Sequence, residues 1–191
     1  EPLSCAMHGV NLLKLHPYQK ALVIGDGFMG ELFVQTLKAM GVHQVDLAGI
    51  SKEKLKLNHD HFDITTFNTA QGDKIPNNAY DIVVEAVGNP ITQEEAIAAT
   101  RRGAQVLMFG VANPKSQFKI NSYEIYQKQL TIQGSFINPY CFEDAIGLLE
   151  SHKVDVLPLI SHELSLGEVE QFTSGKLKDV SKAVVKVNNL K

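Results

Sequence analysis

Three glycines stand at a spacing that could hold a phosphate group. Gly25, Gly27 and Gly30 form the pattern G-x-G-x-x-G, which follows the apolar run 21–24 and opens a helical pattern over 28–40. In such a pattern the first glycine permits a tight turn, the second lets a pyrophosphate approach the backbone, and the third lets the helix lie close to the sheet. Free amides at the helix start would bind the phosphates. We predict a dinucleotide site here; an empty turn between a strand and a helix is the alternative.

The end of the second predicted strand, 45–50, bears on which dinucleotide binds. An enzyme that prefers NAD usually carries Asp or Glu there to hold the ribose diol. Gly49 stands at that place, followed by Ser51 and Lys52. A small residue followed by a hydroxyl and a cation suits a 2′-phosphate, so the pattern favours NADP over NAD. Alternatively, Ser51 only caps the next helix and Lys52 is a solvated lysine. Flavin and S-adenosylmethionine also bind sheets of this kind.

Short apolar runs alternate with helical patterns along most of the chain. The apolar runs predict strands at 21–24, 45–50, 62–64, 81–87, 104–109 and 130–132. The helical patterns cover 28–40, 51–57, 92–101 and 142–149. This alternation predicts an α/β, doubly wound fold with a six-stranded parallel sheet and helices on both faces. After about residue 154 the rhythm changes to a run containing Pro158, a short helix at 166–172 and a late strand at 183–187.

Composition excludes several classes of function. Of the 191 residues, 44% are apolar and 20% are charged, and the net charge of −3 gives no reason to expect a nucleic-acid partner or a membrane surface. Cys5 and Cys141 lie too far apart for a cysteine zinc site, and they favour a reducing compartment, so we expect the cytoplasm. The stretch 58–63 carries two His and two Asp, but we interpret it as a solvated polar loop and expect no metal within this chain.

Five stretches together follow the pattern of one family. They are Glu1–Cys5 with His8 and Gly9 after it, Val23–Gly30, Glu85–Pro90, Phe109–Val111 and Leu130–Phe136. Their order and content resemble the medium-chain, zinc-dependent alcohol and polyol dehydrogenases, particularly the sorbitol and threonine dehydrogenase branch. The resemblance covers nearly the whole chain.

The resemblance implies a set of cofactor-binding residues. In the phosphate loop and at the end of the second strand these are Gly25, Asp26, Gly27, Phe28, Met29, Gly30, Gly49, Ser51 and Lys52. Around the nicotinamide they are Ala86, Val87, Gly88, Phe109, Gly110, Val111, Ser135 and Phe136. Glu1 is similar to an acidic residue beside the family's catalytic zinc, although a solvated terminus explains it as well. Gln127 stands where the family often has an Arg that reaches the cofactor, and Lys128 is a possible substitute.

The resemblance also implies a domain plan and an activity. A Rossmann domain would span 12–154, while 1–11 and 155–191 would connect to a GroES-like catalytic domain that is mostly absent. Because the chain starts abruptly at Glu1 without an initiator Met, we expect a piece of a longer protein. The intact parent would be a zinc-type oxidoreductase that transfers a hydride between a secondary alcohol or polyol and NAD(P), and this fragment alone would be inactive. The alternative is a non-catalytic NAD(P)-binding module that acts as a redox sensor or an assembly subunit.

The last predicted strand would lie at an edge of the sheet. Residues 130–136 are largely apolar and contain no charge or proline that would block pairing with another strand. The resemblance points the same way, and we predict a homodimer with a sheet that runs through both subunits.

Overall fold

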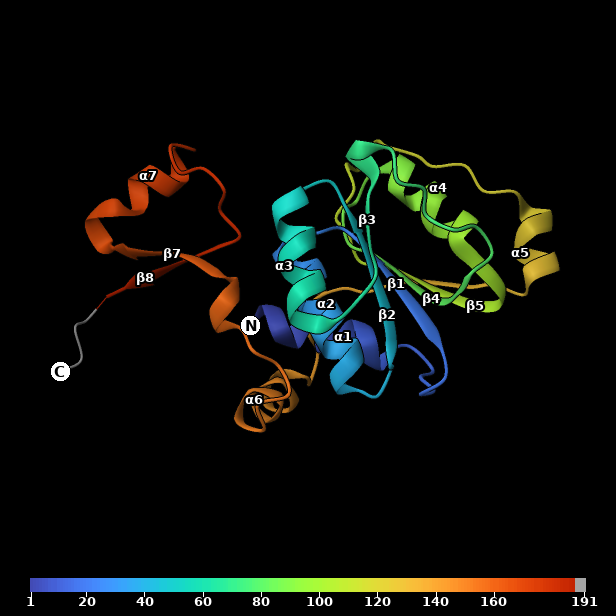
Figure 1. The fold of residues 1–191 in the computed structure, drawn as a ribbon, viewed down its shortest axis with the longest axis horizontal. Coiled ribbons are helices and arrows are strands. Elements are labelled where there is room, and N and C mark those ends of the chain that lie inside the picture. Colours follow the sequence, from blue (N-terminus) through green and yellow to red (C-terminus); the bar gives the residue numbers. More distant parts are fainter. Residues whose placement is uncertain (188–191) are drawn as a thin grey trace. The chain divides into compact units, whose positions relative to one another are not determined.

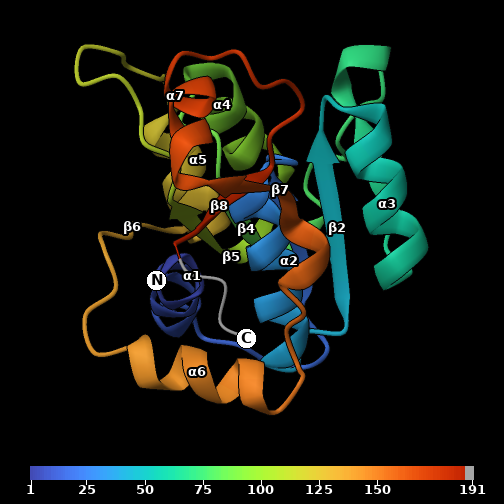
Figure 2. The ribbon, with the colours of Figure 1, turned by 90° about the vertical axis from the view of Figure 1, so that its left-hand side faces the viewer.

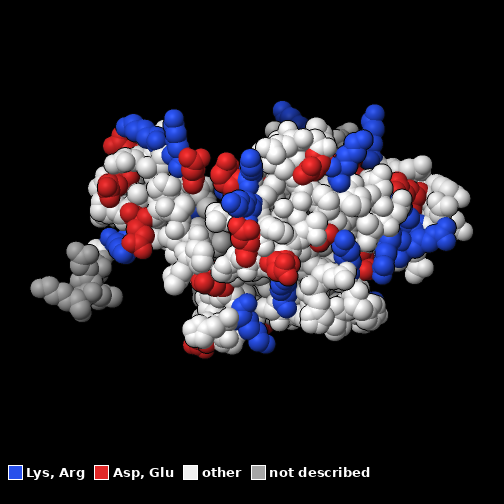
Figure 3. All heavy atoms as spheres, in the orientation of Figure 1, with Lys and Arg blue, Asp and Glu red and all other residues white. Residues whose placement is uncertain are grey.

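The computed structural model describes residues 1–187. It divides into one unit over Glu1–Val154 and a second unit that begins at Asp155, and each unit is described by itself. Within residues 1–187 no helix combines the length and the apolar character needed to cross a bilayer. Basic and acidic side chains are interspersed over much of the face in Figure 3, in keeping with the small net charge.

The first unit is built on a six-stranded parallel sheet with the strand order β3-β2-β1-β4-β5-β6 (Figure 1). Its strands are β1 (Lys20–Ile24), β2 (Gln44–Gly49), β3 (Thr66–Asn68), β4 (Tyr80–Glu85), β5 (Thr100–Met108) and β6 (Thr131–Gly134). Its helices are α1 (Pro2–Asn11), α2 (Phe28–Ala39), α3 (Lys52–Phe62), the 3-10 turn η1 (Thr69–Gln71), α4 (Pro90–Ala99), α5 (Ser122–Lys128) and α6 (Phe142–Glu150). The predicted α/β, doubly wound Rossmann-type fold is confirmed.

The two faces of the sheet are covered by different helices. Leu22 and Ile24 of β1 belong to a buried cluster with Ile97 of α4, whereas Val23 lies beneath Gly30 of α2. Figure 1 shows α4 and α5 on one side of the sheet and α1 and α2 on the other. Strands buried on both faces read as continuous apolar runs, which is why β1 and β4 were recognisable from the sequence.

The pattern of residues 1–13 does not predict α1. This helix packs against α2 and α6, and Figure 2 shows α1 beside α6. A side chain at Gly9 would meet Leu107 of β5 and the ring of Phe33, so a residue without Cβ allows α1 to lie close to the sheet and α2. Cys141, at the N-cap of α6, is buried against α1, with its Sγ 3.9 Å from the Nδ1 of His8.

Three predicted boundaries are wrong, and one of them is the start of the strand predicted at 104–109, which begins at Thr100. The third strand is not at 62–64, because α3 continues to Phe62 and Asp63 ends it in the left-handed conformation with φ 50°; the strand follows at Thr66–Asn68. The helix predicted to end at Arg101 ends at Ala99. Thr100 already pairs with Tyr80 of β4, and Arg101 makes an ion pair with Asp81.

The second unit is small. It contains η2 (Leu157–Leu159), β7 (Ile160–Ser165), η3 (Leu166–Glu168), α7 (Val169–Thr173) and β8 (Lys182–Lys186). β7 and β8 form a parallel pair, and Lys186 makes an ion pair with Glu163 across it. The short helix and the late strand thus lie within two or three residues of their predicted places.

The amino end of the sheet carries a buried polar group whose removal should weaken the fold. Asp46 is 5% exposed, and its carboxylate accepts a hydrogen bond from the Tyr80 hydroxyl at 2.8 Å and pairs with the Lys20 ammonium at 2.9 Å. Tyr80→Phe removes one donor to a buried charge and should lower the free energy of unfolding by about 1.5–3 kcal/mol. Urea unfolding followed by circular dichroism measures the change. Tyr123→Phe, at an exposed hydroxyl, is the matched control; equal stability of the two variants would contradict the assigned role of Tyr80.

Candidate functional site: a dinucleotide cleft

The loop after β1 has three glycines in three different environments. Gly25 has φ +122°, a conformation that L side chains rarely adopt, and its amide donates to the Ala48 carbonyl at 2.8 Å. Gly27 is the exposed N-cap of α2, and a Cβ placed on it would meet no atom of residues 1–187 within 4 Å. A Cβ on Gly30 would overlap the Gly25 carbonyl oxygen. The first and third glycines therefore serve the fold, while the second leaves space that no other part of the described chain uses.

A cleft of about 270 Å³ opens beside this loop, at the carboxyl ends of β1, β2 and β4. Its walls are formed by Ile24, Gly25, Asp26, Gly27, Ala48, Gly49, Ile50, Thr69, Ala86, Val87, Thr92 and Glu95. The strand order reverses between β1 and β4, and ligands of open α/β sheets bind at such switch points. The N-terminus of α2, with its free amides and positive dipole end, lies at this cleft.

The structure places the predicted cofactor residues in two groups. Those that line the cleft are Gly25, Asp26, Gly27, Gly49, Ala86 and Val87. Outside its lining are Phe28, Met29 and Gly30 in the first turn of α2, Ser51 and Lys52 at the start of α3, and Gly88, Phe109, Gly110, Val111, Ser135 and Phe136 beyond the ends of β4, β5 and β6.

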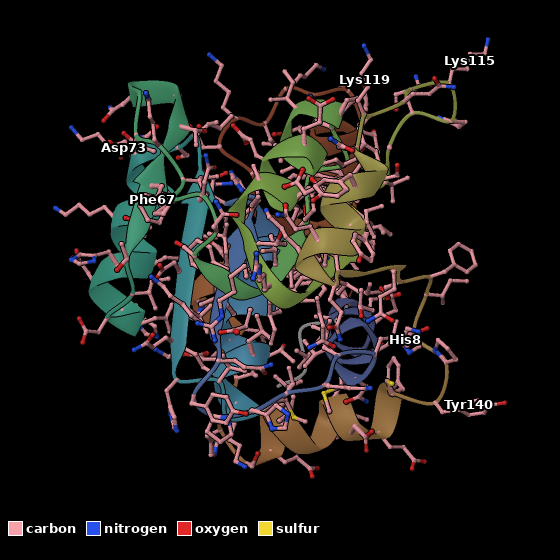
Figure 4. The ribbon with its side chains drawn as sticks, turned by 90° about the vertical axis from the view of Figure 1, so that its right-hand side faces the viewer. His8, Phe67, Asp73, Lys115, Lys119 and Tyr140 are labelled. Carbon is pink, nitrogen blue, oxygen red and sulfur yellow. The ribbon has the colours of Figure 1, made fainter. Side chains whose placement is uncertain are left out.

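Six lining residues were missed by sequence reasoning. Thr69 belongs to the turn after β3, a strand that was misplaced. Its hydroxyl donates to the Gly49 carbonyl at 3.2 Å. The neighbouring Asp73, shown beside α3 in Figure 4, accepts from the Asn68 amide at 2.8 Å and so fixes that turn. Thr92 and Glu95 lie one helical turn apart on α4, so their side chains share a face of the helix. Once α4 is placed beside β4, this spacing predicts that both residues line the cleft. Burial raises the pKa of Glu95 above its ordinary value.

A buried carboxylate braces the wall that follows β4. The Glu85 side chain is 0% exposed and accepts hydrogen bonds from the Val87 and Gly88 amides, both at 2.9 Å, and from the Thr92 hydroxyl at 2.8 Å. Three donors satisfy a charge that would otherwise be costly to bury. Glu85 therefore holds the turn 86–88 in one shape.

The turns that follow β4 and β5 touch through their backbones. Gly88 has φ +81°, and a Cβ on Gly110 would overlap the Gly88 nitrogen. The amides of Phe109 and Gly110 both donate to the Glu85 carbonyl at 2.9 Å. Beyond β6, the Ser135 hydroxyl oxygen is buried and has no hydrogen-bond partner within residues 1–187. A buried hydroxyl without a partner is suited to hydrogen bonding with a bound group.

Ser51 and Lys52, which the sequence pattern predicts to bind a 2′-phosphate, make other contacts in the structure. The Ser51 hydroxyl caps α3 by accepting from the Lys54 amide at 3.4 Å, and exposed Lys52 lines a separate hollow beside β3. Instead, Asp26 reaches this strand end, where its Oδ2 accepts from the amides of Ile50 at 2.8 Å and Ser51 at 2.6 Å. An acid does stand at the end of β2, and it comes from the glycine loop.

The remaining candidates lie away from the cleft. Lys128 is held by Glu124 at 2.7 Å and by the Ile97 carbonyl at 3.4 Å, and Gln127 is exposed. Glu1 is the N-cap residue of α1, and its carboxylate accepts a hydrogen bond from the Cys5 thiol at 3.1 Å. Burial, together with the hydrogen bond and charge of Glu1, raises the pKa of Cys5 to about 11.

The stretch 58–63 and several exposed loop residues also lie outside the lining of the cleft. The stretch 58–63 is not a loop but the end of α3, where side chains two positions apart point in different directions. Within residues 1–187 no group of three or more His, Cys, Asp or Glu side chains could hold a metal ion. Lys115 and Lys119 lie on the loop between β5 and α5, and fully exposed Tyr140 points away from the fold (Figure 4).

An open parallel sheet with a glycine turn at its switch point defines a dinucleotide-binding domain of the Rossmann type. Residues 29–151, more than half of the chain, match the zinc-binding dehydrogenases, and the chain belongs to that family. It is 30% identical over 181 residues to D-arabinitol dehydrogenase 1 of Uromyces fabae, covering 90% of this chain and 52% of that protein. It is 26% identical over 196 residues to galactitol 1-phosphate 5-dehydrogenase of Escherichia coli, covering 95% of this chain and 56% of that protein.

A solved structure shows the same arrangement with a dinucleotide bound. A zinc-binding dehydrogenase from Sinorhizobium meliloti, bound to NADP, superposes with a TM-score of 0.92 at 26% identity, over 98% of this chain and 58% of that one. The chain thus spans about half the length of the relatives that it matches.

The second and third glycines should respond differently to substitution. Gly27→Val places a Cβ where no group of residues 1–187 lies within 4 Å, so the melting temperature should change little. Affinity for a dinucleotide should fall by roughly 100-fold or more, because the side chain takes the place of a phosphate. Gly30→Ala should instead impair folding, because its Cβ overlaps the Gly25 carbonyl. Thermal melts and NADH titrations of both variants test this pair, and unchanged NADH affinity in folded Gly27→Val would refute the phosphate cradle.

Proposed function

We propose that this chain is the nicotinamide-dinucleotide-binding half of a zinc-type alcohol or polyol dehydrogenase. The observation that carries the proposal is the open space over Gly27 at the N-terminus of α2, beside a cleft at the switch point of the sheet. The relatives are dehydrogenases of D-arabinitol and galactitol 1-phosphate, which supports a polyol as the substrate class of the intact parent.

Residues that would hold such a cofactor extend from the glycine loop to the turns that follow β4 and β5. Amides at the start of α2 would bind the pyrophosphate, aided by the helix dipole. The turns 86–88 and 109–111, braced by Glu85, would support the nicotinamide end, with the unpartnered Ser135 hydroxyl and the exposed Phe136 beyond them. When bound, the nicotinamide would supply the hydride chemistry. The task of this chain is to hold the nicotinamide in position.

The rest of the parent is part of the same proposal. Residues 1–11 and 155–191 would join a catalytic domain that supplies the zinc ligands, and Glu1 would lie beside that metal. The zinc would favour the alkoxide of a bound alcohol in the intact parent. The fragment alone would bind nucleotide without turnover, in the cytoplasm. A polyol-dependent reduction of NAD(P) by the intact protein, abolished by a chelator, would distinguish this proposal from a non-catalytic redox-sensing or assembly module.

Nucleotide binding can be measured on the chain as it stands. Titration with NADH and with NADPH, followed by nicotinamide fluorescence, should saturate at one site per chain for at least one of the two. The pattern of Gly49, Ser51 and Lys52 favours NADP, whereas the contacts of Asp26 favour NAD. Failure of both nucleotides to saturate would refute the proposed function.

The edge strand β6 supports the proposed homodimer. Thr131 is exposed on this strand, and no charged residue interrupts 130–136. Light scattering over a range of concentrations should show a dimer, and Thr131→Lys should shift the equilibrium toward monomer because a charge on an edge strand disfavours pairing with another strand. Tyr126→Lys, at an exposed position on α5, adds the same charge away from the edge and is the control. A wild-type monomer at every concentration would contradict the dimer.

A further inference from the structure

The acid at the end of β2 is supplied by an unexpected residue. Asp26 lies between the first two glycines of the motif and lines the cleft. Its Oδ2 accepts from the amides of Ile50 and Ser51, at 2.8 Å and 2.6 Å, while its Oδ1 accepts no hydrogen bond from the described residues. One carboxylate oxygen is therefore fixed on the loop and the other is available to a ligand in the cleft.

The glycine at position 49 and the acid at position 26 depend on each other. A Cβ on Gly49 would overlap the side chain of Asp26, so the space that a side chain at the end of β2 would fill is taken by this carboxylate. Gly49 is itself buried, and its carbonyl is fixed by the Thr69 hydroxyl. Because residue 49 is a glycine and has no side chain, the Asp26 carboxylate can occupy the space at the end of β2.

This arrangement discriminates between a ribose diol and a 2′-phosphate. We propose that Asp26 selects NAD over NADP by accepting hydrogen bonds from the adenosine ribose diol and repelling the 2′-phosphate; the inference rests on the proposed binding of a dinucleotide. A ribose hydroxyl donates to a carboxylate, whereas a phosphate offers only negative charge at neutral pH.

The groups that could compensate a 2′-phosphate are engaged elsewhere. The amides of Ile50 and Ser51 would be its natural donors, and both already donate to Asp26. The Ser51 hydroxyl caps α3, and Lys52 lines the separate hollow beside β3. The fold as such accommodates NADP, as the relative from Sinorhizobium meliloti shows, so the preference has to come from side chains at this strand end.

The test compares NADH and NADPH dissociation constants for the wild-type chain and three variants. Wild type should bind NADH at least about 10-fold more tightly than NADPH. Asp26→Ser and Asp26→Asn remove the charge and should reduce that ratio by about 10-fold or more, through weaker NADH binding and stronger NADPH binding. Asp60→Asn removes the same charge from an exposed position on α3 and should leave the ratio unchanged.

The outcomes separate this inference from the proposed function. If wild type binds neither nucleotide, the proposed function fails and the inference fails with it. If wild type binds both but prefers NADPH, or if folded Asp26 variants keep the wild-type ratio, the role of Asp26 is refuted while cofactor binding stands. If the variants do not fold, competition against bound NADH by 5′-AMP and 2′,5′-ADP on wild type decides the question. Stronger competition by 5′-AMP supports the inference, and stronger competition by 2′,5′-ADP overturns it.

Discussion

The contact between the start of α2 and the turn after β1 is the constraint on which the rest of the site depends. Gly30 touches the Gly25 carbonyl so closely that no side chain fits between them. This contact fixes the first turn of α2 against the end of β1, beside the position where the strand order reverses. The helix N-terminus then faces the cleft, and Gly27 leaves its approach open. A larger residue at position 30 would move the helix and remove the phosphate cradle with it.

Local sequence was sufficient to predict the sheet because its central strands are buried on both faces. β1 and β4 each contain a continuous apolar run, 21–24 and 82–84, followed by Gly25 and by the turn that Glu85 holds in place, so their type and order could be predicted. The short strand β3 was misplaced, since Thr66–Asn68 carries little apolar signal and the polar helix α3 runs further than its pattern suggested. The helix α1 was also missed, because its packing on Leu107 and Phe33 depends on residues distant in sequence.

The site was predictable where backbone geometry dictates residue type, and less so where a side chain reaches across loops. A glycine motif predicts a tight turn and a close approach of a phosphate or a helix to the backbone. Roles could therefore be assigned to Gly25, Gly27 and Gly30. The contact from Asp26 to the amides of Ile50 and Ser51 joins residues 24 and 25 positions apart, and no local pattern encodes it. The rule for the end of the second strand expects an acid at position 49, where the chain has glycine. The folded chain provides the acid from position 26 instead.

This difference follows from how the cleft is built. Its walls include the glycine turn and residues 86 and 87, and the turn 86–88 contacts the turn 109–111 through backbone atoms that every residue possesses. Backbone amides bind phosphate and can serve any dinucleotide, so they confer little discrimination between NAD and NADP. Discrimination then falls to the few side chains that enter the cleft. Among those near the end of β2, Asp26 is the one whose carboxylate lies in the cleft wall with an oxygen free of hydrogen bonds from the described residues. On the proposed assignment, the open phosphate cradle and the acid beside it would have separate roles: the cradle would provide affinity for any dinucleotide, and the acid would set which one is preferred.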